Sequence, residues 1–194
     1  MPKINPALSY ILGVLVGDGY CNGYRLGLHT TSKKMAQSFA GSLAEITGYP
    51  RNVYKYPVTS KRPRPRFRVS TTRSEILSCL LPYVEDMLKI REVALECPLD
   101  FLRGFYESEG CLSIPKRTGK PRIIFTNTKQ GLVNLVLEVL QVVGFSPTVN
   151  VQRFKKWHGH YGSKPVYRIH LLREKEVHEF LRLTEPSIKG EFNG

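Results

Sequence analysis

The chain has 194 residues, of which 41% are hydrophobic, so it can bury a sizeable core in one domain or two small ones. Lysine and arginine total 29 against 16 acidic residues, and the resulting net charge of +13 makes a polyanion the leading class of partner. The apolar run at 7–16 is about half of the roughly 20 residues that a membrane span needs, so we expect no membrane segment. A signal peptide is the alternative for this run, but no small-x-small cleavage site follows it.

The first ninety residues predict an α+β module. Asn5 can cap a helix that opens at Pro6 and carries apolar residues at helical spacing up to Gly19. Next come a strand at 24–31, a helix at 33–48, strands at 52–58 and 66–71, and a helix at 73–88. Four cysteines without paired spacing predict reduced thiols in an intracellular, cytoplasmic protein.

The rest of the chain repeats this order. Pro98 opens a helix, followed by expected strands at 111–115 and 121–127, a helix at 129–143, strands at 148–154 and 166–172, and a helix at 174–183. We therefore predict two αββαββα modules, residues 1–91 and 98–194, with a linker at 92–97.

The repeat is clearest in ILGVLVGDGY at 11–20 and FLRGFYESEG at 101–110. An offset of 91 residues pairs Gly13 with Gly104 and Asp18 with Glu109. Later, an offset of 96 pairs Lys33 with Lys129, and an offset of 100 pairs 67–69 with 167–169. The register drifts because loops are longer in the second copy.

The first helix of each copy has two small residues four positions apart: Gly13 with Gly17, and Gly104 with Ser108. Residues at this spacing lie on one helix face and allow two backbones to approach closely. Such packing would bring Asp18 and Glu109 to the same end of a helix pair, where the helix dipoles disfavour negative charge. A divalent cation would relieve the repulsion, and carboxylate oxygens with the free carbonyls of Gly17 and Ser108 would suit Mg²⁺.

These two stretches resemble the two LAGLIDADG motifs of single-chain homing endonucleases of the kind encoded in archaeal introns. The resemblance covers nearly the whole chain and implies a pseudo-twofold α+β protein, with the motif helices at the interface and two antiparallel sheets forming a DNA-binding saddle. It implies a monomer that makes a staggered break in double-stranded DNA. It also implies Mg²⁺ as cofactor, with two or three divalent ions held by Asp18 and Glu109, and Mn²⁺ or Ca²⁺ able to substitute in binding.

The resemblance further implies polar or basic side chains around the cleavage centre: Lys33 (or Ser32), Arg91, Asn127 and Lys129. Val16 and Glu107 occupy a motif position that is often Asp in relatives. For Glu107 we favour a structural or interface role over that of a further metal ligand.

Alternation along the strands predicts which side chains leave the core: Arg25, His29, Arg66, Arg68, Ser70, Arg168 and His170. Arginines on such a face can reach guanine edges in the major groove. The hairpin tips and strand ends add further predicted DNA contacts, mostly to phosphates: Lys61, Arg62, Arg64, Arg122, Gln152, Lys155 and Lys156. Two modules imply a DNA site of about two helical turns, asymmetric because the two strand faces differ.

Three other functions remain open at this point. The same basic saddle could bind intron RNA as a splicing maturase, or bind DNA without cutting it. A basic protein of the ribosomal kind would leave the paired acidic motifs unexplained.

Overall fold

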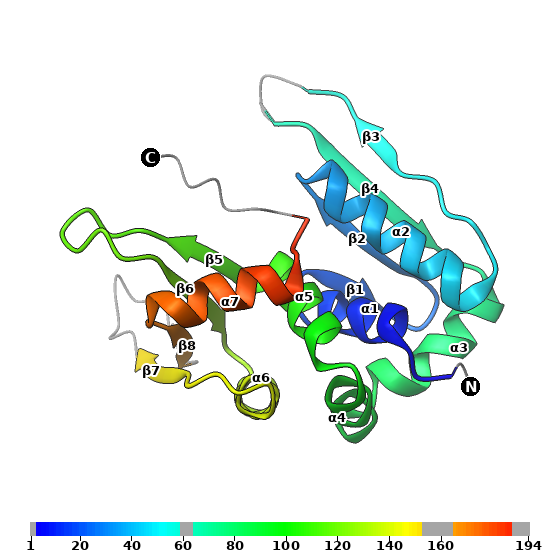
Figure 1. Cartoon of the computed structure of the whole chain (residues 1–194). Coiled ribbons are helices and arrows are strands. Elements are labelled where there is room, and N and C mark those ends of the chain that lie inside the picture. Colours follow the sequence, from blue (N-terminus) through cyan, green and yellow to red (C-terminus); the bar gives the residue numbers. More distant parts are fainter. Residues whose placement is uncertain (1–2, 59–63, 153–164, 188–194) are drawn as a thin grey trace, which may run out of the picture. The chain divides into compact units, whose positions relative to one another are not determined.

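The computed structural model describes residues 3–58, 64–152 and 165–187 (Figure 1). Within these described ranges the fold is α+β with two four-stranded antiparallel sheets, as predicted. The chain divides into two compact units. Unit 1 contains the described residues up to Ser108 together with those from Thr184 onward, and unit 2 runs from Glu109 to Leu183.

Unit 1 is built around α1 (Pro6–Val16). The Asn5 side chain accepts a hydrogen bond from the Leu8 amide at 2.9 Å and Pro6 opens the helix, which confirms the predicted start. Every residue from Ala7 to Leu15 is buried, because α1 contacts helices and strands on several sides. Such a helix is apolar all round rather than amphipathic.

The sheet of unit 1 has the strand order β1-β2-β4-β3. Its strands are β1 (Gly19–Cys21), β2 (Leu26–Thr30), β3 (Tyr54–Tyr56) and β4 (Arg66–Thr71). Helix α2 (Lys33–Thr47) lies across one face of this sheet (Figure 1) and ends where Gly48 adopts a left-handed φ of 71°. Leu26, Leu28 and Val69 point to that face and are fully buried.

The helix expected at 73–88 is instead two helices, α3 (Ser74–Val84) and α4 (Met87–Glu96). Asp86 caps the second, accepting a hydrogen bond from the Leu88 amide at 2.9 Å. Most of the segment expected as a linker is therefore helical. It is also anchored, since the Ser9 hydroxyl of α1 donates to the carbonyls of Val93 at 3.3 Å and Cys97 at 2.8 Å. Helix α5 (Pro98–Glu109) follows directly.

Unit 2 repeats the sheet with the order β5-β6-β8-β7. Its elements are β5 (Gly110–Ser113), β6 (Arg122–Asn127), α6 (Gln130–Val142), β7 (Thr148–Gln152), β8 (Val166–Leu171) and α7 (Glu174–Thr184). Ile123, Phe125 and Ile169 face the core, where the Phe180 ring of α7 meets Phe125 edge-on at 5.9 Å between centroids. These bounds agree with the predicted elements to within a few residues.

The strand registers give the residue-by-residue equivalence of the two sheets. Arg68 pairs with His29 and Tyr54, whereas Arg168 pairs with Thr126 and Asn150. The same registers make Ser32 the equivalent of Lys129, and these are the N-cap residues of α2 and α6. The predicted pairing of Lys33 with Lys129 is therefore wrong by one residue.

No helix within the described parts of the chain is long and apolar enough to cross a bilayer. All four cysteines are free thiols, as expected from their spacing.

Candidate functional site

The two glycine-bearing helices contact each other backbone to backbone inside unit 1. A Cβ atom added at Gly13 would collide with the carbonyl oxygen of Phe101, and one added at Gly104 would collide with that of Tyr10. The Ser108 hydroxyl also reaches across, 3.4 Å from the Val14 carbonyl oxygen. The predicted packing of the small-residue faces is confirmed.

Asp18 lies in the turn between α1 and β1, immediately after the packed helix. It is exposed, and it makes no hydrogen bond or ion pair with any residue that the structure describes. Partial desolvation of the carboxyl raises its pKa above the ordinary aspartate value, so ionisation here carries a cost. A carboxylate with these properties suits a cation.

Glu109 is the last residue of α5 and is held by a specific partner. The Asn127 amide nitrogen donates to Glu109 Oε1 at 3.2 Å, and Asn127 Oδ1 accepts from the Lys129 amide at 2.9 Å. Asn127 thus connects the acidic residue to the N-terminus of α6. At the equivalent position in unit 1, Thr30 Oγ1 accepts from the Ser32 amide at 3.1 Å.

The donors at these positions fit the predicted metal. Carboxylate oxygens are hard ligands of the kind that Mg²⁺ prefers. Within the described residues there is no cluster of three or more histidine, cysteine, aspartate or glutamate side chains.

Two of the predicted basic residues, Lys33 and Arg91, lie on helices other than α1 and α5. Lys33 is exposed as the first residue of α2, and Arg91 is exposed in α4. The hydrogen bonds between α4 and α1 involve Ser9, well before Asp18 in the helix. Arg91 is thus on an element that contacts the first half of α1.

The outer face of the unit 1 sheet is the one predicted from alternation. Arg25, His29 and Arg66 are exposed, and Arg68 and Ser70 are half-buried, while Phe67 and Val69 are buried. Burial lowers the pKa of His29 and the charges of Arg68, Arg66 and Arg25 lower it further, so this surface favours the neutral form of the imidazole.

The outer face of the unit 2 sheet departs from one expectation. Arg168 is exposed as predicted, but His170 is only 8% exposed, so its predicted exposure is wrong. Burial lowers its pKa, and Arg122 and Arg168 lower it further. Alternation alone indicates the face of a strand and not the bulk of the side chains that cover it.

Three tyrosines on the unit 1 face were missed by the sequence analysis: Tyr20, Tyr54 and Tyr56. The His29 ring lies 5.5 Å from that of Tyr20 and 6.2 Å from that of Tyr56, between centroids. Gly27 lies next to the Tyr20 side chain, and a Cβ atom added at Gly27 would come within 2.7 Å of the Tyr20 hydroxyl. Alternation in the segment 52–58 could have found Tyr54 and Tyr56, which are two residues apart.

The predicted phosphate-contacting tips are only partly described. Lys61, Arg62, Lys155 and Lys156 lie outside the described residues, whereas Arg64 and Gln152 are exposed and Arg122 is half-buried. The β5–β6 connection adds basic residues that the prediction did not name. Arg117 and Lys120 line a hollow of about 400 Å³ together with Arg122.

Comparisons with known proteins agree with this geometry. A family model described as a LAGLIDADG-like domain matches residues 96–184. The homing endonuclease I-DmoI, in a crystal structure with DNA and Mn, has a TM-score of 0.62 at 19% identity, over 94% of this chain and 97% of that one. The second half of the chain thus matches the LAGLIDADG-like family model, and nearly the whole chain shares the fold of I-DmoI.

Other matches show how widely this fold occurs. Full-length WhiA from Thermotoga maritima has a TM-score of 0.61 at 13% identity, over 95% of this chain and 56% of that one. Two uncharacterised proteins of Methanocaldococcus jannaschii, MJ0398 and MJ0314, are each 26% identical to this chain, over 95% and 82% of it. The chain spans 68% and 63% of their lengths.

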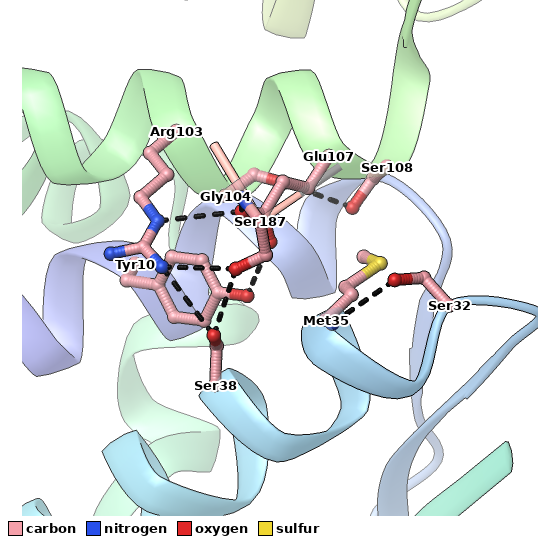
Figure 2. A network of polar contacts seen from close by, with 9 residues as sticks. All are labelled: Tyr10, Ser32, Met35, Ser38, Arg103, Gly104, Glu107, Ser108 and Ser187. Carbon is pink, nitrogen blue, oxygen red and sulfur yellow. Dashed lines mark hydrogen bonds and ion pairs between the residues drawn. The ribbon is translucent and has the colours of Figure 1, made fainter. Parts of the chain in front are cut away.

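The second LAGLIDADG motif differs from the first at Glu107, which is buried at the centre of a polar network (Figure 2). Glu107 Oε2 accepts from the Tyr10 hydroxyl at 2.6 Å, and Oε1 accepts from the Ser187 amide at 2.5 Å and from Arg103 Nε at 3.3 Å. Arg103 Nη2 in turn donates to the hydroxyls of Ser187 at 3.1 Å and Ser38 at 3.4 Å. Both oxygens of the Glu107 carboxylate therefore accept hydrogen bonds from protein donors.

The network joins four separate parts of the chain within unit 1: α1, α2, α5 and the segment that follows α7. The Arg103 guanidinium lies 5.1 Å from the centroid of the Tyr10 ring. Burial raises the pKa of Tyr10 far above its ordinary value and the neighbouring Glu107 raises it further, so the phenol remains a donor. The placement fits the structural role favoured for Glu107. The spacing of Arg103 and Glu107 was a signal for their ion pair, but nothing in the sequence pointed to Ser187.

Proposed function

We propose that this LAGLIDADG protein is a site-specific homing endonuclease that makes a staggered double-strand break in an asymmetric DNA site with divalent metal ions. One observation carries the proposal: the two motif helices pack through Gly13 and Gly104, and each runs into a single carboxylate, Asp18 or Glu109. I-DmoI, whose fold this chain shares, has been crystallised with DNA and Mn, with DNA and Ca, and as a variant with its target DNA and Mg.

Asp18 and Glu109 are the proposed metal ligands, with the carbonyls of Gly17 and Ser108 as further donors. A divalent ion held there would polarise the scissile phosphodiester and the attacking water. Asn127 orients Glu109 through their hydrogen bond. Lys33 and Lys129, at the starts of α2 and α6, are proposed to lie near the cleaved phosphates.

The outer faces of the two sheets are the proposed DNA-binding surfaces. They carry arginines at equivalent registers, and the chain as a whole has a net charge of +13. Binding is therefore expected to weaken steeply with salt, with a log–log slope of about −0.9 per neutralised phosphate. Because the residues beside these arginines differ between the sheets, the two halves of the site should differ in sequence.

The test is cleavage of a randomised plasmid library with Mg²⁺ or Mn²⁺, followed by sequencing of the cut ends. Wild type should release ends that share one sequence. Asp18→Asn and Glu109→Gln should each abolish double-strand cleavage while binding persists. Glu75→Gln, which removes an exposed carboxylate from the first turn of α3, is the matched control and should cut normally.

Three results would count against the proposal. Unchanged cleavage by Asp18→Asn would remove the metal assignment. Wild type that binds the selected DNA but never cuts it would indicate a DNA-binding protein without nuclease activity. RNA competing better than the selected duplex would instead favour the maturase alternative.

A further inference from the structure

Arg68 is the central basic residue on the outer face of the unit 1 sheet. It lies on β4 between His29 of β2 and Tyr54 of β3. Its guanidinium carbon is 5.5 Å from the ring centroid of Tyr54 and 5.5 Å from that of Tyr56. Both distances are within the range of cation–π attraction, so two tyrosine rings hold the guanidinium in place.

The donors of this guanidinium have no acceptor in the described protein. Arg68 makes no hydrogen bond or ion pair with any residue that the structure describes, and its Nε is buried without a partner. Buried polar groups normally find a partner. A half-buried guanidinium that is held by apolar faces and lacks an acceptor is prepared for a ligand that supplies acceptors.

We propose that Arg68 reads one guanine in the DNA site, and that Tyr54 and Tyr56 make this reading strict by fixing the guanidinium before binding. The inference rests on the proposed DNA-binding function. The O6 and N7 atoms of guanine present two acceptors in the major groove, which matches the planar fork of arginine. Since less side-chain freedom is lost on binding, a fixed arginine discriminates better than a mobile one.

Unit 2 provides the internal comparison. Arg168 has the same register as Arg68, but its neighbours are Thr126 and Asn150, neither of which has a ring. Arg168 is also exposed where Arg68 is half-buried. The position read by Arg168 is therefore expected to tolerate other bases more readily than the position read by Arg68.

The experiment is selection of binding sites from a randomised duplex library in the absence of Mg²⁺, so that binding is measured apart from cleavage. Wild type should enrich a site with one invariant G·C pair that depends on Arg68. Arg68→Gln should change the preference at that pair from guanine to adenine, since glutamine matches the acceptor and donor of adenine. A merely structural role for Arg68 would not move the preferred base.

Tyr54→Asn tests the tyrosine clamp, by which we mean the rings of Tyr54 and Tyr56 next to the Arg68 guanidinium. Asparagine is chosen because it is the residue that unit 2 has at the same register. It should lower the guanine preference at that same pair by about three- to tenfold and leave the other positions unchanged. Arg168→Gln is the matched control. It should alter a different base pair, by a smaller factor, and thermal unfolding should show that all variants are folded.

Each outcome decides between the alternatives. If Arg68→Gln keeps every base preference, weakens binding uniformly and reduces the salt slope by about one, Arg68 contacts a phosphate and the assignment is wrong. An unchanged guanine preference in Tyr54→Asn would overturn the role of the clamp. If wild type enriches no sequence at all, the proposed function fails, and this assignment with it.

Discussion

The two copies share a strand order but surround their acidic residues differently. Asp18 in the first copy has no described protein partner, whereas Glu109 in the second is hydrogen-bonded by Asn127. Two residues before each acid, the first copy has Val16 and the second has Glu107 in its buried network. Equivalent backbones thus do not impose equivalent surroundings, because the side chains at matched registers decide what each carboxylate meets.

The glycines at the helix contact are what the copies share most strictly, and replacing them should have the largest effect. Gly13→Ala or Gly104→Ala places a Cβ against backbone, which no rotamer change relieves, so we expect a loss of more than about 3 kcal/mol in unfolding free energy. Chemical denaturation measures this. Gly41→Ala in α2 has open space at its Cβ and should instead gain up to about 1 kcal/mol. Equal effects at Gly13 and Gly41 would contradict the contact.

Because of the Glu107 network, truncating the residue two positions before the acid should destabilise the protein more in the second motif than in the first. Glu107→Ala leaves the Tyr10 hydroxyl and the Ser187 amide without their acceptor, and should cost about 3 kcal/mol. Val16→Ala at the equivalent position should cost about 1 kcal/mol. The denaturant midpoints of the two variants measure these losses of stability. A larger loss for Val16→Ala than for Glu107→Ala would contradict the prediction.

Removing the support of Glu109 should reduce activity more than binding. Asn127→Ala frees the carboxylate that it orients, and loss of such supporting hydrogen bonds typically costs about 10- to 100-fold. Single-turnover cleavage of the selected site measures the rate. Thr30→Ala, the equivalent change in unit 1, should alter the rate by less than about threefold. A matched loss in both variants would mean that the two acids are supported alike.

The smallest effect concerns the pH dependence of stability at Asp18. Desolvation raises its pKa in the folded state, so protonation favours folding and stability declines as pH rises through that pKa. Asp18→Asn removes this cost at pH 7 and should raise the melting temperature by no more than about 2–4 °C. The advantage should disappear near pH 3. An asparagine variant that is less stable at pH 7 would contradict the desolvated carboxylate.

Sequence patterns predicted the duplicated α+β order, the strand at 66–71, the N-cap Asn5 and the contact between Gly13 and Gly104. Each depends on local periodicity or on small residues four apart, which are visible along the chain. They also predicted Asp18 and Glu109 as the acidic residues at the ends of the two motifs. The separate helix α4 was missed, although its cap Asp86 is a local signal that the sequence contained. The anchoring of α4 to Ser9 of α1 is a tertiary contact that no local pattern indicates.

What the sequence determined by itself is the set of elements and the residues that end each motif, because helix and strand periods depend on neighbours in the chain. Tertiary structure alone decided which side chains meet: Asn127 beside Glu109, Ser187 on Glu107, two tyrosine rings around Arg68, and His170 covered on a face where alternation predicts exposure. These contacts join residues from different strands or helices, and their geometry depends on strand register and helix packing rather than on any local pattern.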